Sequence, residues 1–235
     1  MKFFLGIFWC FIATSSIAQH FEQQVWVETG VKYNLNKKLG ASFDLTQRYG
    51  YDGLSTLFPQ LSVRYKISPW FRPSLDYRLI LSKSNAESYD VNQRINANLG
   101  FSHTYKRIDL GLRIRYQYRF DRLVGSYDSE FDQAWRIKPS AEYNIKGLPI
   151  TPSLSTEFFY NPENGENGKQ FNRIRCYAGT AIDLKHNQGI ELGLYFDQWI
   201  NGIPKKRLMY SFSYVISLRS AKKEIKKPSK NLRDL

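Results

Sequence analysis

Arginine residues recur at every second position in parts of the sequence, and this spacing is its most informative chemical feature. In residues 108–120, Arg113, Arg115 and Arg119 alternate with aliphatic and aromatic residues. Successive side chains of a β-strand point to opposite faces, so the arginines would share one face and the apolar side chains the other. A buried charge is stable only when it is paired, so carboxylates of neighbouring strands should meet these arginines. We therefore expect a charge network on the polar face, formed by Arg78, Arg113, Arg115, Arg119, Arg136, Glu142 and Glu157.

Further charged residues fit the same polar face, and they leave two functions open. If the charged groups pair across a narrow interior, the face is the filled lumen of a structural barrel. If they line an open interior, it is an anion-preferring pore. Barrels of about eight strands are filled by side chains, whereas those of about 16–18 strands hold a channel. We favour the filled interior. The additional residues are Arg48, Arg64, Arg72, Arg94, Lys138, Asp44, Asp76, Asp109, Glu191 and Asp197.

Nucleophilic catalysis is the chemical alternative, and one pair of neighbouring residues raises it. Ser102 and His103 are adjacent, but adjacent strand residues point to opposite faces, so the two are not placed for a hydrogen-bonded dyad. An outer-membrane lipid-modifying enzyme would instead need Ser, His and acidic residues of different strands to converge at one rim. The oxygen-rich segment 161–168 lacks the regular spacing and terminal Glu of a calcium loop. We therefore expect no catalytic, cofactor-binding or metal-binding residues, and we interpret the protein as a non-enzyme.

The elements that carry these side chains should be long β-strands. The period of two persists from Val25 to Leu218, in segments of roughly 10–14 residues. Strands of globular proteins usually have about 5–6 residues, whereas a tilted membrane-spanning strand needs about 9–11. Short turns alternate with longer polar loops, as in bacterial outer-membrane barrels, whose short turns face the periplasm. The sequence thus predicts a single all-β, antiparallel, up-and-down transmembrane barrel.

The number of strands is harder to derive. Eleven segments can be counted, but single-chain bacterial barrels have an even number of strands, so we expect ten or twelve in the wall. Either one strand has been missed, or the first segment, residues 25–33, lies in the lumen or pairs differently. Strand-like segments also contain prolines, which have no N–H for the ladder and should mark strand ends or bulges. These prolines are Pro59, Pro73, Pro139 and Pro152.

Composition favours a location in the outer membrane. Aromatic residues make up 16% of the chain, and no apolar stretch has the length of a membrane helix, about 20 residues, so this sequence would have to span a membrane as strands. Aromatic residues gather near both ends of the segments, as in the interfacial girdles of membrane barrels. A soluble lipocalin-like barrel is the alternative, but it would turn its apolar face inward. Near the short turns lie Tyr33, Tyr65, Trp70, Tyr105 and Tyr143, and near the longer loops Tyr49, Tyr118, Phe120, Trp135, Phe158, Tyr160 and Trp199.

The two ends of the chain differ from the barrel segments. Residues 1–18 are typical of a secretory signal peptide, with a basic start, an apolar run and the small-x-small cleavage site Ser16-Ile17-Ala18. Residues 19–220 would form the barrel, and residues 221–235 a basic periplasmic tail. The formal net charge is +13, but outside the tail the basic residues are spread singly along the strands. We therefore expect no nucleic-acid partner, which would require a basic patch.

Short motifs follow one another along the chain in a recognisable order. They are Asp76-Tyr77-Arg78, Arg113-Ile114-Arg115-Tyr116-Gln117-Tyr118-Arg119, Thr151-Pro152, Glu157-Phe158-Phe159-Tyr160 and Arg173-Ile174-Arg175. In this order and spacing they resemble a family of uncharacterised outer-membrane barrels, domain of unknown function 2490, over nearly the whole chain after the signal. The resemblance implies a barrel in the cell outer membrane, and the family has no established catalytic residues to carry over to this sequence. Such a protein would contact outer-membrane lipids and lipopolysaccharide, and the barrel-assembly machinery would insert it.

Overall fold

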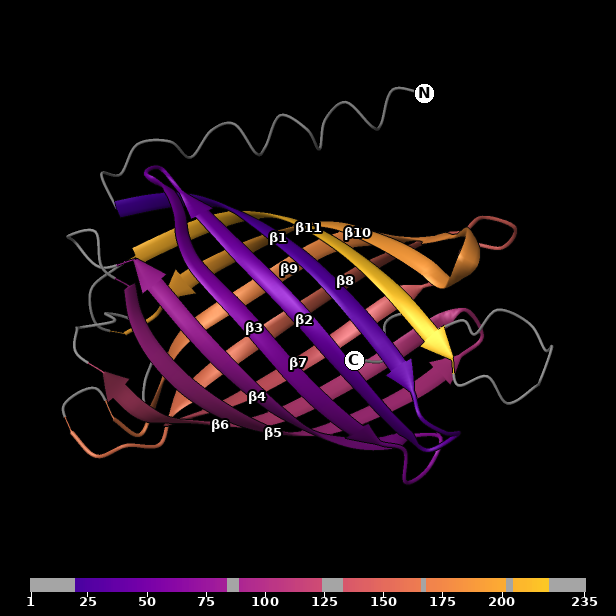
Figure 1. Cartoon of the computed structure of the whole chain (residues 1–235), viewed down its shortest axis with the longest axis horizontal. Coiled ribbons are helices and arrows are strands. Elements are labelled where there is room, and N and C mark those ends of the chain that lie inside the picture. Colours follow the sequence, from indigo (N-terminus) through magenta and orange to yellow (C-terminus); the bar gives the residue numbers. More distant parts are fainter. Residues whose placement is uncertain (1–19, 84–88, 124–132, 166–167, 202–204, 220–235) are drawn as a thin grey trace.

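The alternating segments form β-strands in the computed structural model, which describes residues 20–83, 89–123, 133–165, 168–201 and 205–219. Together they make one closed barrel, which confirms the predicted all-β, up-and-down barrel fold (Figure 1). No helix among these described residues is long and apolar enough to cross a membrane. The predicted signal peptide (1–18) and tail (221–235) lie outside the described residues. In chain order the elements are β1 (His20–Asn34), β2 (Leu39–Gly50), β3 (Gly53–Tyr65), β4 (Phe71–Lys83), β5 (Tyr89–Tyr105), β6 (Ile108–Leu123), β7 (Gln133–Tyr143), β8 (Ile150–Asn161), β9 (Gln170–Leu184), the 3-10 helix η1 (Lys185–Asn187), β10 (Gln188–Trp199) and β11 (Lys205–Arg219).

The ring closes through a parallel pair of strands. Each strand pairs antiparallel with its neighbour in sequence, and β1 pairs parallel with β11 along its whole length, from His20↔Lys205 to Asn34↔Arg219. The expectation of ten or twelve wall strands is therefore wrong, because the wall has eleven. In an up-and-down barrel with an odd number of strands, the first and last strands run in the same direction, so only a parallel ladder can join them. The first segment thus belongs to the wall.

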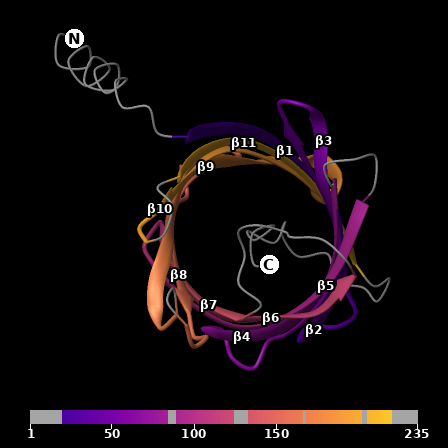
Figure 2. The same ribbon diagram turned by 90° about the vertical axis from the view of Figure 1, so that its left-hand side faces the viewer.

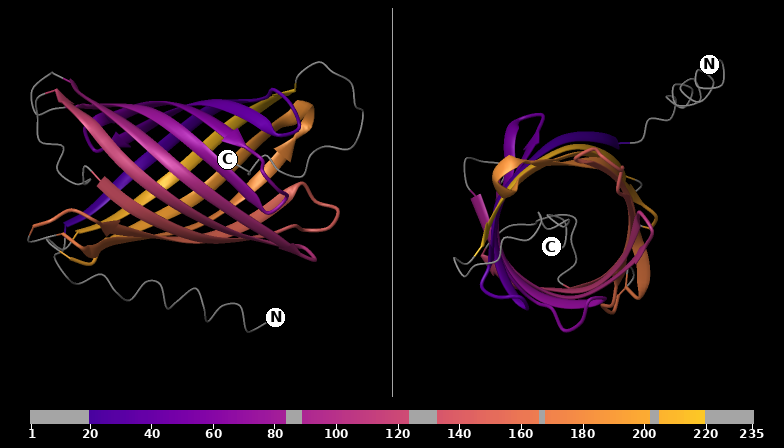
Figure 3. Two further views of the ribbon diagram at one scale, coloured as in Figure 1. Left: turned by 90° about the horizontal axis from the view of Figure 1, so that it is seen from below. Right: turned by 90° about the vertical axis from the view of Figure 1, so that its right-hand side faces the viewer.

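The two ends of the barrel differ in their connections (Figures 1 and 3). The end that we call the short-turn end carries the connections β1–β2, β3–β4, β5–β6, β7–β8 and β9–β10, of which β5–β6 is only Lys106 and Arg107. The opposite end, the long-loop end, includes the connections at residues 124–132 and 162–169, together with the short turn Tyr51-Asp52. Because β1 and β11 are parallel, β1 begins at the long-loop end and β11 finishes at the short-turn end.

The two faces of the wall have opposite chemistry. On β6, Leu112 is exposed on the outside, whereas Arg115 and Gln117 are buried on the inside. The strands enclose the lumen as one ring in the end-on view (Figure 2). The barrel is polar inside and apolar outside, the reverse of a water-soluble protein. Every strand exposes large apolar side chains, for example Val31, Phe43, Leu61, Leu75, Leu99, Leu112, Ile137, Leu154, Phe171, Leu192 and Phe212.

The four prolines interrupt the wall in two ways. Pro73 and Pro152 are the third residues of β4 and β8, so they lie at strand ends, as expected. Pro59 and Pro139 lie inside β3 and β7. At Pro59 and Pro139 the pairing with β4 and β8 is interrupted, but the register on either side of the gap is the same. The strand ends or bulges that were expected at these two prolines are therefore absent. The missing N–H of proline accounts for each gap.

Candidate functional site

Side chains pack the half of the lumen that lies nearest the long-loop end. Arg94, Asn96, Asp197 and Met209 point into the barrel, and none of them is more than 1% exposed. They come from β5 on one side of the ring and from β10 and β11 on the other. Polar and charged groups on opposite sides of the ring are therefore buried in this half of the lumen, as in narrow barrels whose interior side chains fill.

Glu157 on β8 is the centre of the first charge cluster. Its Oε1 accepts hydrogen bonds from Nη2 of Arg113 at 2.7 Å and from Nε of Arg136 at 3.0 Å. Its Oε2 accepts a further bond from Nη2 of Arg136 at 2.8 Å. Arg113 and Arg136 lie on β6 and β7, so the cluster links neighbouring strands, and the Arg136 contact is bidentate, the strongest geometry for this pair.

Asp76 on β4 is the centre of a second cluster. Its Oδ2 accepts hydrogen bonds from Nη2 of Arg115 at 3.0 Å and from the side-chain amide of Asn98 at 2.9 Å. Nε of Arg115 in turn donates to Oδ1 of Asn98, so the three residues form a closed triangle across β4, β5 and β6. All three are buried, which makes their mutual hydrogen bonds necessary.

The sequence analysis placed Asp197 on the polar face, but it missed the basic residues that form a third cluster with it. Asp197 on β10 accepts two hydrogen bonds from Arg175, at 2.6 and 2.7 Å, and lies 3.7 Å from Nη1 of Arg173. Arg207 and Lys205 of β11 both pair with Glu22 of β1, across the parallel seam. Arg173-x-Arg175 has the same spacing as Arg113-x-Arg115. The spacing was therefore a usable signal that Arg175 faces the lumen, although it did not identify Asp197 as the partner of Arg175.

Aromatic rings provide the remaining contacts of several guanidinium groups. Arg48 lies between Trp26 and Phe58, with its guanidinium carbon 3.9 and 4.2 Å from the two ring centres. Trp199, which the sequence placed in the outer aromatic belt, instead contacts Arg173 at 5.1 Å, so that assignment is wrong. A weakly hydrated guanidinium stacks well on an aromatic face, which explains why the inner face is not purely polar.

The other residues of the predicted network lie apart from these clusters. Nε of Arg78 donates to the side-chain oxygen of Gln60 on β3 at 2.7 Å. Arg119 is buried in the packed half of the lumen. Glu142 lies near the short-turn rim, opposite Asp109 in the register of β6 and β7. The seven residues therefore occupy different depths of the lumen, of which only Arg113, Arg136 and Glu157 are joined by the ion pairs described above.

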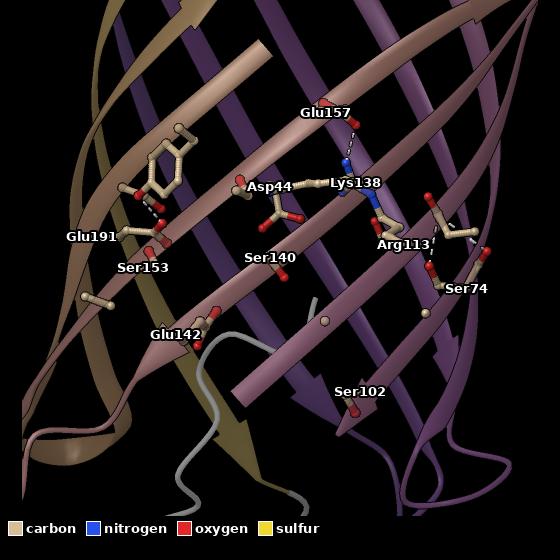
Figure 4. Close-up of a pocket in the computed structure, with 18 of the residues that line it drawn as sticks. Asp44, Ser74, Ser102, Arg113, Lys138, Ser140, Glu142, Ser153, Glu157 and Glu191 are labelled. Carbon is tan, nitrogen blue, oxygen red and sulfur yellow. Dashed lines mark hydrogen bonds and ion pairs between the residues drawn. The ribbon is translucent and has the colours of Figure 1, made fainter. Parts of the chain in front are cut away.

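A cavity of about 840 Å³ occupies the lumen towards the short-turn end (Figure 4). The charge clusters around Glu157 and Asp76 border it on the inner side, and residues close to the short turns, such as Ser102 and Glu142, line its mouth. Serine hydroxyls line much of the wall between them. They belong to Ser42, Ser62, Ser74, Ser140, Ser153, Ser155 and Ser213.

The cavity does not assemble a hydrolytic site from the candidates of the sequence. Ser102 is half-buried on the inner face of β5, and the His103 side chain is exposed next to it. Ser102 and His103 are not arranged as a catalytic dyad, because their side chains project from opposite faces of the strand. Within the described part of the chain, no group of three or more His, Cys, Asp or Glu residues could hold a metal ion. What the charged side chains of the lumen can do chemically is to form ion pairs.

Comparison with known proteins places the chain in a family without a known activity. A family model described as "Protein of unknown function (DUF2490)" matches residues 23–210. No curated protein and no solved structure matches the chain. The matched region runs from β1 into β11, so it covers nearly the whole ring.

Proposed function

Since the chain belongs to DUF2490, a family of unknown function, its role has to be inferred from its own residues, and we propose that it is an integral outer-membrane barrel whose lumen is closed by paired charges. In this proposal the wall contacts outer-membrane lipids and lipopolysaccharide, and the barrel-assembly machinery inserts the chain. The short-turn end faces the periplasm, as in other bacterial barrels. The role is structural, or that of a narrow channel.

The reversed polarity of the wall carries this proposal. Leu75 and Leu154 are 57% and 63% exposed on the outer face, whereas Glu157 is 3% exposed on the inner face. In water, the continuous apolar exterior would be a large hydrophobic patch, which soluble monomers avoid. In a bilayer the same surface meets hydrocarbon, and the polar groups face the lumen.

Strand length and aromatic residues support the same location. The strands have 11 to 17 residues, enough for tilted crossings of the hydrocarbon core, which need about 9–11. Tyr65, Trp70 and Tyr105 are exposed near the short-turn end, and Tyr118 and Trp135 towards the long-loop end. Two such belts suit a wall with a membrane interface at each end. A soluble lipocalin-like barrel would have its apolar face inside.

Fractionation of Gram-negative cells that express the chain tests the location. We expect the protein in the outer-membrane fraction, released only by detergent, and with a gel mobility that changes on heating. An endogenous outer-membrane barrel and a soluble periplasmic protein serve as controls. Recovery with the soluble periplasmic protein would overturn the proposal.

A further inference from the structure

Every turn at the short-turn end carries positive charge, and none of these turns contains a carboxylate. The β1–β2 turn has Lys37 and Lys38, the β5–β6 turn is Lys106-Arg107, and the other three turns have one lysine each. All of these side chains are exposed, and within the described part of the chain none of them forms an ion pair. We call this set the basic rim, and its members are Lys37, Lys38, Lys66, Lys106, Arg107, Lys146 and Lys185.

The connections at the long-loop end have the opposite composition. They comprise residues 51–52, 84–88, 124–132, 162–169 and 200–204, whose sequence includes a single basic residue, Lys169. A general need for solubility would apply to both ends of the barrel, so it does not account for the basic rim. The acidic residues in these connections are Asp52, Glu87, Asp128, Glu130, Asp132, Glu163 and Glu166.

Backbone hydrogen bonds join the short turns to one another. The N–H of Lys66 donates to the carbonyl of Lys38 at 2.7 Å, which links the β1–β2 and β3–β4 turns. The N–H of Asn144 donates to the carbonyl of Arg107 at 2.8 Å, which links the β5–β6 and β7–β8 turns. The basic rim therefore follows the edge of the wall, and its spacing is set by the barrel.

Exposed aromatic residues lie directly next to the basic rim. Tyr65 precedes Lys66, and Tyr105 precedes Lys106, whose ammonium lies 5.3 Å from the Tyr105 ring centre. Tyrosines at the end of a membrane strand mark the level of the lipid headgroups. One residue of extended chain spans about 3.3 Å, and a lysine side chain can direct its charge towards the headgroups. In the proposed bilayer, the lysines of the basic rim therefore reach the lipid phosphates.

The carboxylates nearest to the basic rim lie on the lumen side of the wall. Asp109 and Glu142 are half-buried and line the mouth of the cavity, and Asp109 accepts a hydrogen bond from the Thr104 hydroxyl. In the described residues neither carboxylate forms an ion pair with a member of the basic rim. A counter-charge for the basic rim therefore has to come from outside this part of the chain.

We propose that the basic rim binds anionic phospholipid headgroups in the leaflet at the short-turn end. A phosphate accepts charge-assisted hydrogen bonds from lysine and arginine, and an anionic bilayer surface attracts basic residues that lie within a Debye length. A zwitterionic headgroup carries its own ammonium, which offsets this attraction. The inference rests on the proposed membrane location, and it adds the class of lipid and the leaflet.

Quenching of tryptophan fluorescence by brominated lipids tests the proposal. Trp70 is exposed near the short-turn end and Trp135 towards the long-loop end, whereas Trp26 is buried and Trp199 contacts lumen arginines. The full chain is reconstituted in vesicles that contain brominated phosphatidylcholine, and Trp135→Phe or Trp70→Phe leaves one exposed reporter. Trp9, which lies outside the described residues, is replaced by Phe in every sample.

Competition by unbrominated phosphatidylglycerol gives its binding constant relative to phosphatidylcholine at each reporter. At Trp70 we expect phosphatidylglycerol to bind at least ~3-fold more tightly, and at Trp135 we expect no preference. In about 1 M salt, where the Debye length falls to about 3 Å, the preference at Trp70 should disappear.

Neutralisation of the basic rim tests whether these residues cause the preference. A variant with one substitution in each turn should lose the preference at Trp70, and a control variant neutralised near the long-loop end should keep it. Heat-modifiable gel migration verifies that both variants are folded. The rim variant combines Lys37→Gln, Lys66→Gln, Lys106→Gln, Lys146→Gln and Lys185→Gln, and the control combines Lys83→Gln, Lys169→Gln and Lys206→Gln.

Failure of this inference can be told apart from failure of the proposed location. If brominated phosphatidylcholine quenched neither Trp70 nor Trp135, the wall would not contact lipid, and both proposals would be refuted. If it quenched both tryptophans, the location would stand. In that case, equal binding of the two lipids at Trp70, an equal preference at both ends, or a preference that survives in the rim variant would refute the role of the basic rim alone.

Discussion

Glu157 illustrates how single residues hold the lumen together. It is buried between Arg113 and Arg136, and its oxygens accept hydrogen bonds from both. Such a pair stabilises less than its Coulomb energy suggests, because both partners lose hydration. Removal of one partner is much more damaging, since it leaves a buried charge without a counter-charge. Glu157 is therefore needed chiefly to compensate the positive charges of Arg113 and Arg136.

Replacement of Glu157 should destabilise the barrel strongly. Glu157→Ala leaves Arg136 buried without its bidentate partner and should lower the free energy of unfolding by about 3–5 kcal/mol. Denaturant titration in lipid vesicles measures this change. Glu142→Ala removes the same charge from the half-exposed rim and should change the free energy by about 1 kcal/mol or less. Equal effects of the two substitutions would contradict the central position of Glu157.

At the scale of the element, each strand separates two environments. Along β6 the side chains alternate between the outer surface, where Leu112 is exposed, and the lumen, where Arg113 meets Glu157. A shift of register by one residue would reverse every one of these positions, so the alternation and the pairing of the strands reinforce each other. The proposed bilayer adds a strong constraint on the outer face.

A charge should therefore be tolerated on one face of β6 and not on the other. Leu112→Arg or Ile114→Arg puts an arginine in the hydrocarbon, which costs roughly 2–4 kcal/mol near the midplane, and should block assembly. Arg113→Leu should be milder, since Glu157 retains its two bonds from Arg136. The yield of heat-modifiable protein in the outer membrane is the measurement. The face assignment would be wrong if Arg113→Leu were as damaging as Leu112→Arg.

The second prediction for the strands concerns the parallel pairing of β1 with β11. Thr29 and Tyr214 are register partners across β1 and β11, and neighbouring strands lie about 4.8 Å apart, within disulfide range. In a chain without native cysteines, Thr29→Cys with Tyr214→Cys should form an internal disulfide on oxidation, seen as a gel shift. Thr29→Cys with Tyr210→Cys, about 13 Å out of register, should not. Cross-linking of the second pair instead of the first would rule out this closure.

In the proposed function the lumen of the whole barrel is a vestibule that is closed at one end. The long-loop half is packed by side chains, and the cavity opens towards the other end. Eleven strands lie between the narrow filled barrels and the wide porins, so the side chains decide whether a path remains. A solute that entered the cavity would therefore leave by the same end, and would pass through only if the packed half rearranged.

Conductance distinguishes the closed lumen from a pore. In planar bilayers the wild-type barrel should conduct ions poorly, and Arg115→Ala should change this little while it destabilises the fold, because Asp76 loses its ion-pair partner. The pore hypothesis predicts anion-selective channels that Arg115→Ala weakens at little loss of stability. Large, steady wild-type channels would therefore reject the closed lumen and make transport the leading function.

The strands and their two faces could be predicted from the alternation of residues along the chain. Alternation is a local property of an extended chain, so the opposite positions of Leu112 and Arg113 follow from their neighbours alone. The same pattern places Trp199 on the lumen face, two residues after Asp197, and its indole contacts Arg173 and Arg207 there, so the assignment of Trp199 to the outer aromatic belt departed from the alternation. Local patterns also did not identify Asp197 as the ion-pair partner of Arg175.

The closure of the ring and the partners of the charged residues could not be predicted from the chain, because both depend on the folded barrel. The parallel pair β1–β11 follows from the odd number of strands in the complete ring, which no single segment reveals. The pairing of Arg175 with Asp197 depends on the register between β9 and β10, and that of Arg113 with Glu157 reaches across β7. The division of the lumen into a packed half and a cavity depends on the summed volumes of side chains from every strand. These are properties of the closed wall, because each joins residues that the chain keeps far apart until the ring has formed.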